Sequence, residues 1–215
     1  MKKLILVSAL SLTGLFAAPA WAESQYVAPA ITTSTASAHL DFTVVIPQVL
    51  FLRVGTSSGN SATDTTVDSI TYTVPGANVG DASVISGVGG DLTTGAVTVR
   101  TYGNGGNISL NSTTTGPLTT GNAGEVIPWS QINVATAPLT GTTTGFTNAG
   151  ITHPAFNTGA AGGTGTATTL TATNKVVRVE GKWTYTYLNT NSVAAGTYGG
   201  TVAKNGRVTY TATQL

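Results

Sequence analysis

The sequence predicts an all-β protein, specifically an antiparallel Ig-like or Greek-key β-sandwich that follows a cleaved signal peptide. First, residues 176–188 alternate between apolar and polar side chains, which is typical of a strand. Second, threonine is abundant throughout, and its β-branched, polar side chain suits the solvated face of a strand. Third, only 8% of the residues are charged, so the exposed helix formers Lys and Glu are few. No convincing helix is expected after residue 22.

The longest predicted strand covers residues 176–188. Its odd positions carry mainly aromatic and apolar residues, and its even positions carry charged residues and threonine: Val177, Val179, Trp183, Tyr185 and Tyr187 against Arg178, Glu180, Lys182, Thr184 and Thr186. Successive side chains of a strand point to opposite faces. We therefore expect one face to pack into the core and the charged face to meet water.

The first 22 residues have the pattern of a secretory signal peptide. Lys2 and Lys3 precede an apolar run over residues 4–18, and Ala20-Trp21-Ala22 forms an A-x-A cleavage site. The sequence thus predicts an exported protein located in the periplasm, at the cell surface or outside the cell. The expected organisation is a signal peptide over 1–22, a flexible extension over 23–36 and a single β-sandwich domain over 37–215.

The first strand of the domain is predicted over residues 37–46. Ala38, Leu40, Phe42, Val44 and Ile46 occupy every second position and so share one face. Pro47 interrupts the pattern, and an apolar run continues over residues 49–54. Proline inside a strand indicates an edge or a bulge, so we expect one long strand that kinks at residue 47 and passes from one sheet to the other.

The middle of the chain predicts several shorter strands. They cover residues 67–74, 79–88, 96–102, 107–111 and 126–134, with Ile70, Tyr72 and Val74 pointing inward in the first. Gly103-Asn104-Gly105-Gly106 is expected to form a tight hairpin between two of them. At the carboxyl end, Asn205-Gly206 predicts a second hairpin between residues 197–203 and 208–213, because both residues tolerate the positive φ of a type I′ turn.

Composition and motifs give no support for catalysis. The chain has no cysteine, a formal charge of +1 and only two histidines, His39 and His153. Gly55-Thr56-Ser57-Ser58-Gly59 fits G-x-S-x-G, but the helix that a hydrolase nucleophile elbow requires is not predicted after it. The acidic residues near the loops, Asp64, Asp68, Asp81 and Asp91, are interpreted as turn caps and not as calcium ligands. We expect no enzyme activity, no cofactor, no metal site, no nucleic-acid partner and no membrane span.

Two aromatic residues are candidates for ligand contact. Trp129 and Tyr102 could stack on a sugar, although the core is the favoured place for Trp129 because an isolated Trp beside strand residues is usually structural. The Thr/Gly/Ala-rich stretch Pro138–Leu170 is interpreted as an exposed recognition segment or a decorated crossover, because loops of this length are usually functional or mobile.

Both ends of the mature chain resemble bacterial fimbrial subunits and spore-coat-U-like secreted sandwiches. The resemblance lies in the export signal, the first strand over 40–46, the Ala-Gly-Thr-Tyr motif at residues 195–198 and the last strand over 208–212. It implies a bacterial surface protein that self-associates or forms a pilus-like assembly through edge strands. In such an assembly one subunit lends an extended strand to the next. The extension over residues 23–35 is the candidate donor.

The predicted function is therefore that of an exported structural or adhesive protein that acts by association, with a glycan or host surface as a further partner. Two alternatives stay open. The first is a carbohydrate-binding or other ligand-binding module that uses Trp129 or Tyr102. The second is a small outer-membrane protein, because about ten strands can be counted and Tyr and Trp side chains could form girdles at the bilayer surface.

Overall fold

A computed structural model describes residues 24–57, 59 and 63–215, so the predicted signal peptide and Ser58 lie outside the described residues. The chain divides into two units, residues 1–46 and residues 47–215. The second unit is built from β-strands with three short 3-10 turns, and the described residues contain no α-helix. The predicted all-β fold class is confirmed.

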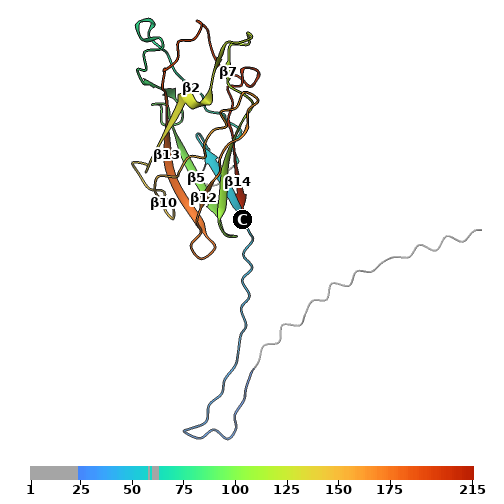
Figure 1. The fold of residues 1–215 in the computed structure, drawn as a ribbon. Coiled ribbons are helices and arrows are strands. Elements are labelled where there is room, and N and C mark those ends of the chain that lie inside the picture. Colours follow the sequence, from blue (N-terminus) through green and yellow to red (C-terminus); the bar gives the residue numbers. More distant parts are fainter. Residues whose placement is uncertain (1–23, 58, 60–62) are drawn as a thin grey trace, which may run out of the picture. The chain divides into compact units, whose positions relative to one another are not determined.

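The larger sheet of the second unit is centred on β13 (Val177–Tyr187). On one side β13 pairs with β5 (Ala96–Gly103), which in turn pairs with β1 (Leu50–Val54), and both pairings are antiparallel. On the other side it pairs with β9 (Ile132–Ala137) and the parallel β10 (Thr147–Asn148), whereas β3 (Ile85–Ser86) pairs with the end of β13 on the same side as β5. In Figure 1, β13 and β5 run side by side through the body.

The second sheet is centred on β6 (Ile108–Thr114). The last strand, β14 (Thr209–Gln214), covers one edge of β6, whereas β12 (Thr168–Leu170) and β11 (Gly163–Thr164) lie on the other. Two short pairs complete the unit: β2 (Ile70–Thr71) with β4 (Val88–Gly89), and β7 (Leu118–Thr119) with β8 (Val126–Ile127). The 3-10 turns are η1 (Gly76–Asn78), η2 (Trp129–Gln131) and η3 (Val202–Lys204).

One apolar core lies between the two sheets. It contains residues from β5, β6, β13 and the segments between them: Val97, Val99, Leu110, Ile127, Trp129, Ile132, Ile151, Trp183, Tyr185 and Tyr187. The inward face predicted for residues 176–188 is thus confirmed. Ile70, Tyr72 and Val74 also pack against this core as predicted, although only Ile70–Thr71 of that stretch forms a strand.

Two predicted hairpins are absent. The glycine-rich turn at residues 103–106 joins β5 to β6, but these strands pair in different sheets, because both edges of β5 are occupied by β1 and β13. At the carboxyl end, residues 202–204 form η3, and β14 pairs with β6. The Asn205 side chain is bonded to Thr115 Oγ1 (3.0 Å) and Pro117 O (3.0 Å), so it fastens this turn to another loop. The positive φ of Asn205 agrees with the prediction. The pairing does not, because β14 pairs with β6 and not with residues 197–203.

The charged face of β13 is covered around Glu180, contrary to expectation, whereas Arg178 on the same face is exposed as expected. Glu180 is 0% exposed, and Arg100 beside it on β5 is 4% exposed. Residues from the 138–150 stretch lie over this pair, because Thr143 bonds to both side chains and Phe146 packs on the Arg100 guanidinium, 4.9 Å from its ring centroid. This part of Pro138–Leu170 is therefore a covering crossover.

The first unit contains no strand among its described residues, so the strand predicted over 37–46 is wrong. Its few internal bonds include a turn closed by Ser34 N donating to Ile31 O (2.8 Å) and a bond from Ser37 N to Gln25 Oε1 (2.9 Å). The compact body starts at Pro47, ten residues later than the expected boundary. The alternation of residues 38–46 predicted an apolar face correctly in form. It did not produce a strand, because an isolated extended segment has no neighbouring strand to form hydrogen bonds with.

Candidate assembly surface

The segment over residues 38–46 carries an apolar face that its own unit does not bury. Leu40, Phe42, Val44 and Ile46 are between 74% and 84% exposed. The polar positions between them include Asp41 and Thr43. This strand-like alternation marks residues 38–46, and not the predicted 23–35, as the part of the extension best suited to join a sheet. We name residues 38–46 the apolar segment.

Two of the strands at the margins of the sheets, β1 and β14, each have one unpaired edge. Among the described residues, β1 pairs only with β5 and β14 pairs only with β6. These two strands lie side by side, and Gln48 Nε2 donates to Gln214 Oε1 (3.4 Å). An unpaired edge presents backbone N–H and C=O groups that can template a further strand. We call β1 and β14 the open edges.

The core is less completely covered along the open edges than at its centre. Leu52 and Val54 of β1, with Tyr210 and Ala212 of β14, are only partly buried although they pack against the core. By contrast, Val99, Leu110 and Trp183 on the central strands are 0% exposed. An additional strand on either edge would remove more of this apolar surface from water.

The Asn104 side chain holds the backbone on both sides of Gln48, at the junction that precedes β1. Asn104, in the turn after β5, accepts a hydrogen bond from Val49 N at Oδ1 (2.8 Å) and donates from Nδ2 to Pro47 O (2.9 Å). This pair of bonds holds residues 47–49 to the body. Sequence reasoning placed Asn104 in a hairpin turn and missed this contact, which nothing local in the sequence signals.

Trp129 lies in the core, as favoured from the sequence. It is 6% exposed, its Nε1 donates to Gly116 O (2.7 Å), and its ring packs on Phe156 with centroids 5.0 Å apart. A sugar-stacking platform needs an exposed ring face. The ring meets only a shallow hollow of about 290 Å³ that it shares with His153 and Phe156.

Tyr102, the other aromatic candidate, lies on β5 and is partly buried. The guanidinium of Arg178 stands 5.3 Å from its ring centroid and 4.8 Å from that of Phe146. Such cation–π contacts stabilise packing at sites of partial burial. Tyr102 lies on β5, whereas Trp129 lies in η2.

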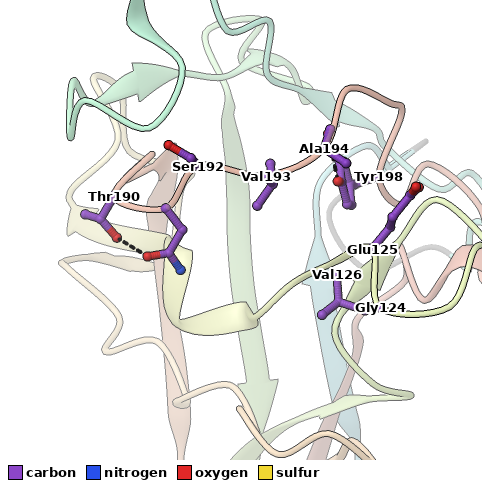
Figure 2. Close-up of a pocket in the computed structure, with 9 residues that line it drawn as sticks. Gly124, Glu125, Val126, Thr190, Ser192, Val193, Ala194 and Tyr198 are labelled. Atoms are coloured by element: carbon purple, nitrogen blue, oxygen red, sulfur yellow. Dashed lines mark hydrogen bonds between the residues drawn. The ribbon is translucent and has the colours of Figure 1, made fainter.

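A hollow of the body lies between two loops (Figure 2). It measures about 600 Å³ and is lined by residues 124–126 on one side and by residues 190–194 with Tyr198 on the other. The Glu125 carboxylate accepts hydrogen bonds from Thr120 and Asn122, which together lower its pKa. A carboxylate stabilised in its charged form is a poor general acid.

Residues of the G-x-S-x-G match and the four loop aspartates make hydrogen bonds that stabilise the loops. Ser57 Oγ donates to Gly59 O (2.8 Å), and Asp68 binds Thr56 N (2.5 Å) and Oγ1 (2.8 Å). Asp64 and Asp81 accept from the backbone N–H groups two residues further on, as caps do, whereas Asp91 accepts from Thr98 N (2.8 Å) and forms an ion pair with Arg53 (3.1 Å). No cluster of potential metal ligands occurs in the described part of the chain. Nor does that part contain a helix with the length and apolarity needed to cross a membrane.

Comparisons with known proteins return no match. No protein-family model matches the chain, and neither the curated proteins nor the solved structures include a match.

Proposed function

We propose that this protein is an exported structural or adhesive surface protein that acts by association and not by catalysis, as a fimbrial or pilus-like subunit does. The apolar segment of one copy adds as an extra strand to an open edge of a second copy. The observation that carries this proposal is the alternating apolar face at residues 40–46, which is left uncovered within its own unit.

The energetics support strand addition. Burying a side chain such as Leu, Phe, Val or Ile contributes about 1.5–3 kcal/mol, and the apolar segment offers four of them on one face. Main-chain bonds to the open edge add affinity, while alternate side chains fix the register. Because the donor precedes β1 in each copy, every bound subunit still presents its own donor and the contact propagates head to tail.

The carbohydrate-binding alternative has less support. The ring of Trp129 is buried, and the Tyr102 ring is partly occupied by Arg178. The export, surface location and adhesive role of the protein are part of the proposal.

Two adjacent valines provide the test. Val44 lies on the apolar face and Val45 on the opposite face, so an Asp at each position adds the same charge with opposite geometric consequences. The protein without residues 1–22 is expected to form oligomers that grow with concentration in analytical ultracentrifugation and negative-stain microscopy. Val44→Asp should reduce the association constant at least tenfold, whereas Val45→Asp should leave it within about threefold.

Two results would contradict the proposal. One is a wild-type protein that stays monomeric at high concentration. The other is an equal effect of the two substitutions, since association would then not depend on which face of the segment is apolar.

A further inference from the structure

The apolar segment has two conceivable acceptors: an open edge of another copy or an open edge of its own body. The segment is followed directly by Pro47, Gln48, Val49 and then β1. Antiparallel pairing along the whole of its own β1 therefore requires the chain to reverse within these three residues. The geometry of this junction decides which acceptor is available.

The backbone group that such a reversal needs is already in use. In a turn through Pro47 and Gln48, the carbonyl of Ile46 would accept a hydrogen bond from Val49 N. In the structure, Val49 N donates to Asn104 Oδ1 (2.8 Å), and the second bond from Asn104 holds Pro47 O (2.9 Å). The side chain of Asn104 thus takes the donor that would close the turn.

A two-residue loop would also turn the polar side of the apolar segment toward the core. With Pro47 and Gln48 as the loop, Ile46 lies opposite Val49, and counting along both strands places Thr43 opposite Leu52. Directly opposite residues share a face of the sheet. Leu52 points to the core, so the polar side of the segment would face inward and Phe42 and Val44 would face out.

A three-residue loop would turn the apolar side of the segment toward the core, but it would strain the backbone. With residues 47–49 as the loop, Val44 would lie opposite Leu52 and the apolar side would point inward. This loop is a type I turn followed by a residue in the left-handed conformation, which would be Val49. A β-branched residue with positive φ is a genuine outlier, and the turn again needs Val49 N.

We infer that the junction at residues 47–49, fixed by Asn104, closes the chain's own β1 edge to the apolar segment and thereby favours the β1 edge of a second copy over the chain's own. Asn104 acts as a positioning residue that favours assembly over self-pairing. The inference rests on the proposed function for the identity of the partner, but the closure of the chain's own edge can be measured without assembly.

The experiment combines hydrogen exchange with sizing. The double variant Asn104→Ala/Val49→Gly frees Val49 N and permits the left-handed loop residue. In dilute, monomeric protein we expect the amides of residues 38–46 to be unprotected in the wild type and at least tenfold slower to exchange in the double variant. At high concentration the double variant should stay monomeric while the wild type assembles.

The matched control is Asn148→Ala. Asn148 makes the same kind of paired bond, accepting from Leu139 N (2.7 Å) and donating to Leu139 O (2.8 Å), but it fastens a loop on β13. In the Asn148→Ala variant the amides of residues 38–46 should exchange as fast as in the wild type, and the variant should assemble like the wild type. Circular dichroism establishes that each variant is folded before its exchange is compared.

The outcomes separate the two claims. Protected amides at residues 38–46 in the wild-type monomer would overturn the inference, and this measurement needs no variant. An unprotected segment in a folded double variant that assembles like the wild type would also overturn it. A wild type that never assembles, with the expected difference in exchange, would overturn the proposed function and support closure of the chain's own edge.

Discussion

At the scale of single residues, the core contains a polar network built around one imidazole. His153 Nε2 and Tyr210 Oη are 2.7 Å apart, and Tyr210 Oη lies 3.0 Å from Tyr185 Oη. The imidazole also makes edge contacts with the rings of Trp183 and Phe156. Burial lowers the pKa of His153 to about 4, so the imidazole is neutral near pH 7.

This depressed pKa predicts a loss of stability in acid. The unfolded chain takes up a proton at His153 near pH 6.5, whereas the folded protein does so only near pH 4. The stabilising contribution is complete above pH 6.5 and disappears as the pH falls to about 4, by up to about 3 kcal/mol. Urea unfolding at several pH values measures this slope, and His153→Gln should flatten it. An equal slope in both proteins would show that other groups are responsible.

At the scale of elements, the pair formed by Arg100 on β5 and Glu180 on β13 fastens the crossover to the sheet. Arg100 Nη2 lies 2.8 Å from Glu180 Oε2, and Thr143 N donates to Glu180 Oε1 (2.5 Å). Burial alone would raise the pKa of Glu180, but the bonds from Thr143 and the charge and bonds of Arg100 lower it below its usual range. The carboxylate is therefore charged in the folded state.

Removing the negative charge of Glu180 should weaken the attachment of the crossover to β13 and lower the stability of the fold. In Glu180→Gln, Arg100 keeps its positive charge in a buried site without the counter-charge, so we expect the free energy of unfolding to fall by about 3 kcal/mol. Lys182→Gln, two residues further on the same face of β13 and partly exposed, should change it by less than about 1 kcal/mol. Urea denaturation compares the two. Equal effects would indicate that the pair contributes no more than a surface charge.

At the scale of the whole molecule, the chain consists of a body over residues 47–215 and a preceding unit that contributes no strand among its described residues. The core residues all belong to the body. The stability of the monomer should therefore come from the body alone, whereas the apolar segment contributes to association.

This division predicts the effect of truncation. A protein that begins at Pro47 should unfold within about 2 °C of the full mature chain in dilute solution, because almost no core contact is removed. It should also fail to oligomerise at high concentration. Differential scanning calorimetry and ultracentrifugation measure the two effects. A drop of 5 °C or more would place residues 24–46 inside the cooperative fold.

Much of the architecture was predictable where local patterns and tertiary contacts agree. The alternation in residues 176–188 identified β13 and its inward Trp183, Tyr185 and Tyr187. The isolated Trp129 was correctly favoured as a core residue. Asp64 and Asp81 were recognised as caps because an Asx side chain reaches backbone groups only a few residues away. These features depend on short stretches of chain.

The sequence alone determined the fold class and which side of each strand is apolar, because side-chain alternation is a property of the extended backbone itself. It did not determine what covers each side. The tertiary structure placed the 138–150 stretch over Glu180 and put β6 into the second sheet, because strand pairing depends on edges contributed by distant parts of the chain. Asn104 shows the same limit, since its bond to Val49 spans 55 positions.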